Sequence, residues 1–430
     1  MQKNDPSSID VISKIWHFIP MKIKEMYEKW TSVSLVLRIL IGLAIGSALG
    51  LLIPGLPYIG LLGTAFVASL KAVAPILIMM IIITSLITRS EGLGSRFRLV
   101  IILYFLSSVI AAAVAVVVFY INPVEISIPV SEETATVTDF ETFVNNIIVS
   151  ILTNPVKALV EANYLGILFW AVIIGLLMKP MASEHVIHIS KDITNLLLKV
   201  ISIFIQFAPF GVLGIIYQSL SDNGTEIFAE YGTLILVIVA VMAIVMFVTN
   251  PMIVAIVGKR NPYPLLIQCI KGSAITAFFT RSSAANVPVN LELCEKMGLD
   301  KEFYSTAIPL GSAINMCGAA VTISILAMTA AYSCGLEVPL GEAIVLCVVA
   351  TLCACGSSGV AGGSILLVPM ACSILGVPEI SGSAMIAVGF VIGVIQDSCE
   401  TALNSSSDVL FTATVDGIEK ERQKKAETTE

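Results

Sequence analysis

The stretch from residue 343 to residue 376 reads AIVLCVVATLCACGSSGVAGGSILLVPMACSILG and constrains the topology of everything around it. Two apolar limbs of 13 residues each, 343–355 and 364–376, flank a tip of small residues at 356–363. As a helix, each limb would be about 20 Å long, whereas the hydrocarbon core of a bilayer is about 30 Å thick. Neither limb can cross a membrane alone, so the sequence predicts a re-entrant helical hairpin here.

The composition of the whole chain shows why lipid is the relevant solvent. Of its 430 residues, 57% are hydrophobic and 13% are charged, whereas soluble domains carry about 25% charged residues. A soluble globular protein is therefore excluded. The net charge of −7 at pH 7 also argues against a nucleic-acid partner, because nucleic-acid binding needs basic surfaces.

Long apolar runs predict an all-α polytopic membrane protein with eight transmembrane helices. A helix needs about 20 apolar residues to cross a bilayer. Runs of this kind cover residues 34–54, 60–88, 99–121, 163–180, 192–218, 232–258, 302–333 and 381–415. The hairpin at 343–376 falls between the last two runs.

The distribution of Lys and Arg orients these spans. Basic clusters alternate along the chain with acidic loops such as 122–142 and 219–231. Since basic loops stay on the cytoplasmic side, we expect a multi-pass protein of the cell (inner) membrane with both termini in the cytoplasm. Residues 1–33 would form a cytoplasmic segment that can lie on the membrane surface, and we expect the charged tail 416–430 to be disordered.

Counting the crossings reveals a second hairpin. The sixth span ends on the cytoplasmic side at Lys259, and the seventh begins there, after Lys301. The segment 263–297 must therefore cross an even number of times, and it is too polar and too short to cross twice. Two hairpins that enter from opposite sides, each followed by a span, form an inverted repeat, which is typical of secondary transporters. A channel with re-entrant loops is the weaker alternative.

The last span carries acids without basic partners. Residues 302–419 contain no Lys or Arg, yet Asp397, Thr401, Asn404 and Asp408 follow one face of a helix there, with Glu400 at its edge. Ionised carboxylates at membrane depth are costly unless a cation meets them. The intramembrane candidate is Arg281, at the tip of the first hairpin. The cargo can supply the missing charge as an ammonium group and a sodium ion; alternatively, the acids are protonated or face a water-filled vestibule.

Four motifs, in this order and spacing, resemble the dicarboxylate/amino acid:cation symporter family, which has the glutamate-transporter fold. The resemblance runs from the first span to the tail and is strongest from residue 263 onward. The motifs are Thr280-Arg281-Ser282-Ser283, Asn315-Met316-Cys317-Gly318-Ala319, the tip Gly359 to Gly363, and Asp397-x-x-Glu400-Thr401-x-x-Asn404-x-x-x-Asp408. Within the family, the chain most resembles the bacterial serine/threonine:sodium symporters.

The resemblance implies a set of binding residues. It implies that Asp397 holds the substrate ammonium, with help from Thr401 and Asn404, and that Ser283 and the hairpin tips hold the substrate carboxylate. The substrate-binding residues are then Arg281, Ser282, Ser283, Val360, Gly362, Asp397, Glu400, Thr401 and Asn404. The sodium-binding residues are Gly311, Asn315, Asn404 and Asp408, with Tyr104, Ser107, Ser108 and Ser357 at further positions.

The resemblance also implies how the chain is divided and assembled. Residues 34–90 and 122–220 would form a scaffold that trimerises, and 97–121 and 230–415 a transport domain that moves like an elevator. The partners implied are therefore the lipid bilayer, two further copies of the chain in a homotrimer, and a small-molecule substrate. Sodium is the implied coupling ion.

Departures from the family pattern predict the substrate class. Members that carry acidic substrates have Arg where Glu400 stands and Thr where Ala319 stands. Because Glu400 would repel a side-chain carboxylate, we expect a small neutral amino acid, above all L-serine or L-threonine. Those members also have Asp where Cys317 stands, so its absence implies one or two coupled sodium ions.

Two alternatives remain at this stage. One is a sodium- or proton-coupled transporter of acidic amino acids or dicarboxylates. The other is an intramembrane serine protease, suggested by the Ser-rich segment 356–359. A serine nucleophile needs a positioned base, and neither His nor Lys lies in the late spans. We therefore do not expect an enzyme.

Overall fold

The structure of the protein is a computed structural model that describes residues 30, 32–88, 95–128, 148–149, 151–357 and 362–427. Within these ranges the regular structure is entirely helical, which confirms the predicted all-α class. Val360, one of the predicted substrate-binding residues, lies outside the described residues.

The helices follow one another along the chain with few long connections. In the first half they are α3 (Leu35–Leu52), α4 (Ile59–Ile87), α5 (Ser95–Ile121), α7 (Pro155–Val160), α8 (Tyr164–Met178), α9 (Glu184–Ile205) and α10 (Ala208–Asn223). In the second half they are α11 (Glu226–Ile244), α12 (Asn250–Gly258), α13 (Tyr263–Cys269), α14 (Ile275–Thr280), α15 (Ser283–Lys296), α16 (Lys301–Ile314), α17 (Cys317–Ser333), α18 (Leu340–Ala354), α19 (Val368–Ile374) and α20 (Glu379–Glu427).

Several of these helices are long and apolar enough to cross a membrane. Within the described ranges, five pass on length and composition, and a sixth passes if α9 and α10 count as one span bent by 53°. Pro209 in the first turn of α10 accounts for this bend, because proline cannot continue a helix from the preceding residues. α3 and α8 are apolar but have shorter apolar stretches, so the count of eight spans remains a prediction.

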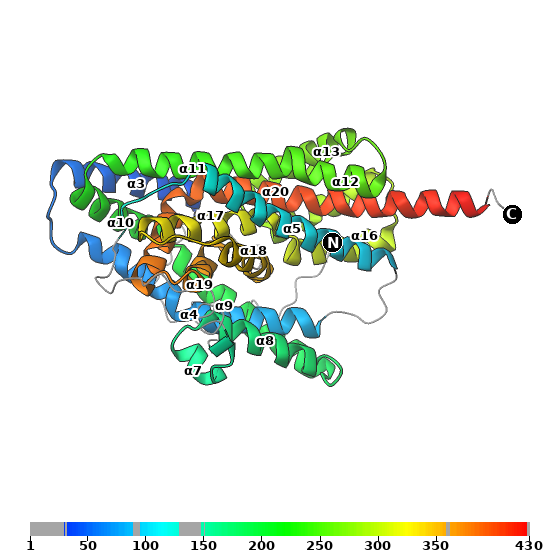
Figure 1. Ribbon diagram of the computed structural model, residues 1–430, viewed down its shortest axis with the longest axis horizontal. Coiled ribbons are helices and arrows are strands. Elements are labelled where there is room, and N and C mark those ends of the chain that lie inside the picture. Colours follow the sequence, from blue (N-terminus) through cyan, green and yellow to red (C-terminus); the bar gives the residue numbers. More distant parts are fainter. Residues whose placement is uncertain are drawn as a thin grey trace.

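Contacts between the helices divide them into two groups. α3, α4, α8, α9 and α10 pack mainly against one another, whereas α5 and the helices from α11 to α20 pack mainly around α17 and α20. In Figure 1, α8 and α9 lie below the long bundle that contains α11, α17 and α20. α20 runs through the second group and touches both hairpins described below. α17 is buried along nearly its whole length. The second group therefore contains the predicted site residues, and α20 is its centre.

Short helices lie at the positions of both predicted hairpins, and we call them hairpin 1 (α14 and α15) and hairpin 2 (α18 and α19). In hairpin 1, α14 ends where Arg281 adopts a left-handed backbone conformation (φ 52°), and Ser282 caps the start of α15. In hairpin 2, α18 packs against α19, and the turn between them includes Gly362 at φ 74°. How deeply the hairpins enter the membrane stays a prediction.

The predicted span 302–333 is not one continuous helix. α16 ends at Ile314, and Asn315 and Met316 have non-helical backbone angles before α17 begins. The amide and backbone groups of Asn315 are thereby free to point toward α20 rather than along a helix. This break lies beside the acidic stripe, as shown below.

The tail beyond residue 416 differs from the prediction of disorder. α20 continues to Glu427, and Asp416 and Lys420 join it to the loop that precedes α16. Lys420 Nζ lies 2.7 Å from Asp416 Oδ2 and donates to the carbonyl of Gly298 at 2.7 Å. Asp300 in the same loop bonds Arg96 at 2.8 Å, which lowers the pKa of that carboxyl below its usual value.

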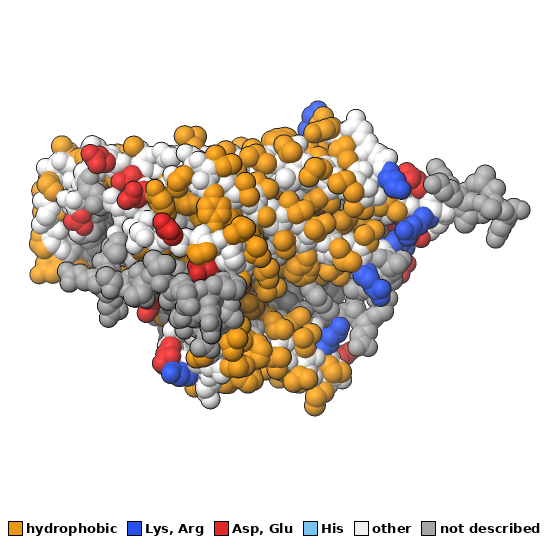
Figure 2. Space-filling model, viewed as in Figure 1, with side chains coloured by type: hydrophobic (Ala, Val, Ile, Leu, Met, Phe, Trp, Pro, Cys, Tyr) orange, Lys and Arg blue, Asp and Glu red, His pale blue; other side chains and the backbone are white. Residues whose placement is uncertain are grey.

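The surface shows a broad apolar band (Figure 2). Orange side chains cover the middle of this face, and most of the Lys and Arg side chains in view lie toward the end where α20 emerges. Several acidic side chains lie toward the opposite end. This is the charge distribution expected of a membrane protein whose C-terminal end faces the cytoplasm.

Close approach of α3 and α10 depends on glycine. Gly42, Gly46 and Gly50 of α3 are spaced by four residues and all face α10. A Cβ atom added at Gly46 would lie 2.5 Å from the carbonyl oxygen of Leu213. Such spacing of small residues lets two membrane helices pack backbone to backbone.

We expect Gly46→Ala to destabilise the protein by about 1–3 kcal/mol, because the added methyl group forces the two backbones apart. Thermal unfolding in detergent measures this. The control is Gly232→Ala in α11, where no atom lies within 4 Å of the added Cβ. Equal melting temperatures for the two variants would show that the α3–α10 contact tolerates a side chain.

Candidate functional site

The polar stripe predicted on the last span lies on α20 and is buried. Asp397, Thr401, Asn404 and Asp408 are each at most 4% exposed. Hairpin 1, hairpin 2, α16 and α17 all contact α20. These contacts bring together residues that are far apart in the sequence.

Asp397 is held by both hairpins. Arg281 Nε donates to Asp397 Oδ2 at 2.8 Å, and Arg281 Nη2 donates to the carbonyl of Gly393 at 3.1 Å. From hairpin 2, the Gly362 amide donates to Asp397 Oδ1 at 3.3 Å. Asp397 therefore has a cationic partner within the protein, namely Arg281, the intramembrane candidate that the sequence offered beside the cargo.

Glu400 has neutral hydrogen-bond donors instead. Its Oε2 atom is 2.7 Å from Thr322 Oγ1, 2.8 Å from Ser364 Oγ and 2.5 Å from Gln396 Nε2. Among the described residues Arg281 forms its ion pair with Asp397, not with Glu400. Glu400 therefore depends on neutral donors in this structure.

Asp408 lies beside the break between α16 and α17. Asn315 Nδ2 donates to Asp408 Oδ1 at 2.8 Å, to Ser407 Oγ at 2.7 Å and to the carbonyl of Asn404 at 3.3 Å. Asp408 Oδ2 and Asn315 Oδ1 are buried and have no hydrogen-bond partner among the described residues. Buried acceptors are nearly always satisfied in proteins, so two such oxygens fit a hard cation as the missing partner.

Gly311 and Tyr104 line the other side of Asp408. A Cβ atom at Gly311 would lie 2.7 Å from Asp408 Oδ1 and 2.9 Å from Tyr104 Oη. Tyr104 Oη is also 3.0 Å from Thr412 Oγ1. The predicted sodium-binding residues Gly311, Asn315 and Asp408 are thus next to one another, with Tyr104 adjacent.

A line of polar contacts links Ser107 to this cluster. Ser107 Oγ donates to Asn250 Oδ1 at 2.7 Å, and Asn250 Nδ2 lies 3.9 Å from Cys317 Sγ. Cys317 Sγ is in turn 3.7 Å from Ser407 Oγ. Ser108 instead donates to the backbone carbonyl of Tyr104 at 3.0 Å, so Ser107 is the hydroxyl directed toward α17.

The remaining predicted residues lie at the hairpin tips and along α20. Ser282 accepts from the amide of Ala285 as a helix cap, and Ser283 is buried in the first turn of α15. Asn404 Oδ1 accepts from the Gly318 amide at 2.7 Å, which places its amide group at the start of α17. Ser357 lies in a junction between hairpin 2, α4 and α9, and no hydrogen bond among the described residues joins it to Asp408.

Sequence reasoning missed a polar cluster that fastens hairpin 1 to α20. Asn286 Nδ2 donates to Ser405 Oγ at 2.8 Å, and Asn290 Nδ2 donates to the Ser405 carbonyl at 3.0 Å. Ser273, on the other limb, donates to Asn290 Oδ1 at 2.5 Å. The i, i+4 spacing of Asn286 and Asn290 was the available signal. Sequence reasoning also missed Thr322, Ser364 and Gln396.

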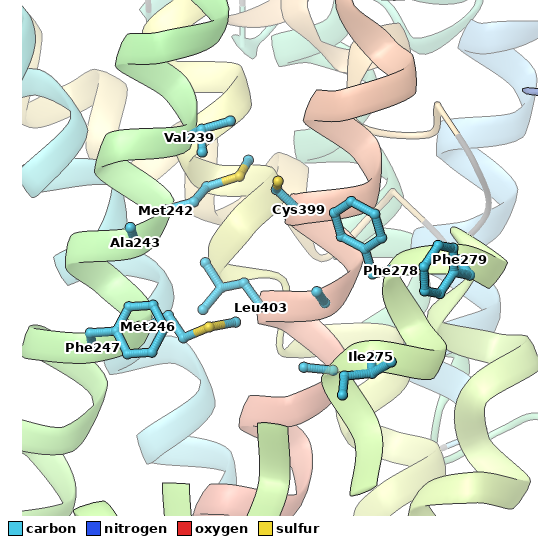
Figure 3. A pocket seen from close by; sticks show the side chains of 12 residues that line it. Val239, Met242, Ala243, Met246, Phe247, Ile275, Phe278, Phe279, Cys399 and Leu403 are labelled. Carbon is cyan, nitrogen blue, oxygen red and sulfur yellow. The ribbon is translucent and has the colours of Figure 1, made fainter. Parts of the chain in front are cut away.

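An apolar cavity of about 350 Å³ lies on another face of α20. Figure 3 shows Met242 and Met246 on one side, Phe278 and Phe279 of hairpin 1 on the other, and Cys399 between them. Every lining residue is apolar or Cys. This cavity therefore offers no charged or hydrogen-bonding side chain comparable to those of the stripe that contains Asp397 and Asp408.

The fold and the relatives of this chain indicate a membrane transporter. Apolar helices surround buried acids, and proteins with similar sequences are membrane transporters, not enzymes. The sequence pattern of the sodium:dicarboxylate symporter family matches residues 35–418. The chain therefore belongs to this family, as the motifs indicated.

The most similar relatives that we compared carry one description. A serine/threonine transporter of Streptococcus thermophilus (strain ATCC BAA-250 / LMG 18311) is 46% identical over 407 residues, covering 94% of this chain and 100% of the relative. One of Streptococcus agalactiae serotype III (strain NEM316) is 46% identical over 393 residues, covering 91% and 98%. One of Bifidobacterium adolescentis (strain ATCC 15703 / DSM 20083 / NCTC 11814 / E194a) is 44% identical over 399 residues, covering 93% of each chain.

We expect Asp397→Asn to destabilise the cargo-free protein by about 3–5 kcal/mol, because it leaves the Arg281 guanidinium buried without a counter-charge. The double variant Arg281→Met/Asp397→Asn should be more stable than Asp397→Asn alone. Thermal unfolding in detergent without amino acid measures both.

The control for these two variants is the exposed ion pair of Glu292 and Lys296, whose charged atoms are 2.6 Å apart. Glu292→Gln should not change the melting temperature measurably, because exposed ion pairs contribute little. If the double variant melts no higher than Asp397→Asn alone, Arg281 and Asp397 are not energetically coupled.

Proposed function

We propose that the protein is a sodium-coupled symporter that imports small neutral amino acids, L-serine and L-threonine above all. The observation that carries the proposal is the pair of acids one turn apart on α20. Both hairpins reach Asp397, and neutral donors surround Glu400. A cargo with a second carboxylate would meet the negative charge of Glu400, whereas a hydroxyl group can donate to it. The relatives described as serine/threonine transporters support the same substrates.

The cargo ammonium takes the place of Arg281 on Asp397 in this proposal. Asp397 Oδ2 accepts from Arg281 when no cargo is present, so the arriving ammonium and the guanidinium compete for one carboxylate. Once displaced, Arg281 is available to the cargo carboxylate, together with the amides at the hairpin tips. One exchange thus satisfies both ends of the amino acid.

Sodium enters as cargo at Asp408. The two unpaired oxygens, Asp408 Oδ2 and Asn315 Oδ1, support this assignment, as does the family to which the chain belongs. With Cys317 replacing a carboxylate near Ser107, a further sodium site lacks one anionic ligand. We therefore propose that one or two sodium ions accompany each amino acid.

The proposal extends to movement and assembly. Residues 34–90 and 122–220 would be the scaffold of a homotrimer, and 97–121 and 230–415 the domain that slides across the cell (inner) membrane by an elevator-like motion. The two groups of helices that pack mainly within themselves support this division. The Lys and Arg side chains near the end of α20 support cytoplasmic termini.

Uptake by the purified protein in liposomes tests the function. With an inward sodium gradient, L-serine and L-threonine should accumulate, L-alanine should accumulate less, and L-glutamate should not. Replacing external sodium by choline at equal ionic strength should abolish accumulation. Accumulation of glutamate, or of serine without sodium, would overturn the proposal.

A sodium-specific prediction concerns Asp408→Asn. We expect sodium to raise the melting temperature of the wild-type protein relative to choline, and this shift to be lost in the variant, because the anionic ligand is gone. Asp300→Asn, at the cytoplasmic end, serves as control and should retain the full shift. An unchanged sodium shift in Asp408→Asn would remove Asp408 from the ion site.

A further inference from the structure

The carboxylate of Glu400 is held asymmetrically. All three of its donors, Thr322, Ser364 and Gln396, bond the same oxygen, Oε2. Among the described residues no donor bonds Oε1. Oε2 is therefore saturated by these donors, while Oε1 accepts from none of them.

The three donors come from three different elements. Thr322 lies on α17, Ser364 precedes the short 3₁₀ turn Ile365–Leu367 of hairpin 2, and Gln396 lies one turn before Glu400 on α20. All three side chains are buried. Gln396 Nε2 also donates to Thr322 Oγ1 at 2.7 Å, so the donors support one another and fix the rotamer of Glu400.

The spacing of the two acids fits a single small cargo. Residues at i and i+3 on a helix are neighbours, with Cβ atoms about 5–6 Å apart. Asp397 and Glu400 have this spacing. An amino acid whose hydroxyl lies two carbons from its ammonium nitrogen can therefore place the ammonium on Asp397 and the hydroxyl on Glu400 Oε1.

We propose that Thr322, Gln396 and Ser364 are positioning residues that present the free oxygen of Glu400 to the cargo hydroxyl and thereby set the preference for hydroxyl amino acids over alanine. This inference rests on the proposed function, since it assumes that serine is carried. The donors act through Glu400 and need not touch the cargo. Loss of one donor lets Glu400 turn and spreads its hydrogen bonds over both oxygens.

Thr322→Val tests the inference, because valine keeps the shape of threonine and removes the hydroxyl. We expect KM for L-serine uptake to rise about tenfold, the size expected for one hydrogen bond to a charged group. KM for L-alanine should change by less than about twofold, because alanine does not use Glu400 Oε1. Thr322→Ser restores the hydroxyl and should return KM for serine toward the wild-type value.

The matched control is Thr329→Val on the same helix. Thr329 is fully buried, and its hydroxyl has no hydrogen-bond partner within the described ranges, so KM for both amino acids should stay unchanged. If Thr322→Val proves too unstable to purify, Ser364→Ala and Gln396→Leu remove the other two donors and should produce the same selective rise for serine.

These experiments distinguish the positioning role of the three donors from the proposed transport function. Equal effects on serine and alanine in the donor variants, or no effect on either, would overturn the positioning role while leaving sodium-coupled uptake intact. Failure of the wild-type protein to accumulate serine or threonine would instead overturn the proposed function. A selective loss for serine with rescue by Thr322→Ser supports both.

Discussion

A carboxylate buried at membrane depth must be met by a cation or by several donors, and the structure around α20 follows from this requirement. Among the described residues, Asp397 accepts from a guanidinium and a backbone amide, Glu400 from two hydroxyls and a side-chain amide, and the Asp408 carboxylate from Asn315 alone. The partners of the three acids come from different parts of the chain. The two hairpins and the break before α17 are arranged so that these partners can reach one helix.

The three acids therefore differ in what they still lack. Asp397 is neutralised within the protein, so a cargo has to compete for it, while Glu400 keeps one oxygen open. Asp408 Oδ2 has no hydrogen-bond partner in the part of the chain that the structure describes. These differences suit the three acids to different ligands. Asp397 suits an ammonium group that exchanges with Arg281, Glu400 suits a neutral hydrogen-bond donor, and Asp408 suits a small cation.

The sequence allowed much of this to be predicted, for identifiable reasons. The structure has the predicted polar stripe on one helix, formed by Asp397, Thr401, Asn404 and Asp408, and the predicted turn at Arg281. Both could be predicted because they depend on residues that are close together in the sequence. The choice of Asp397 as the partner of Arg281 and the donors on Glu400 could not be predicted, because they join positions 36 to 116 residues apart, except for Gln396 at four residues. Periodicity also could not show that α16 ends at Ile314 or that the tail continues α20.

The continuity of α20 has a consequence for observing the protein at work. A helix is a stiff rod that rises about 1.5 Å per residue, and α20 is unbroken from beside Asp397 to Glu427. Whatever displacement the acids undergo is transmitted along this rod to its exposed end, where the side chain of Arg422 is 67% accessible. A spectroscopic label attached at that end would therefore move together with Asp397 and Asp408. Distances measured to the label would report the displacement of the acids without a change to either of them.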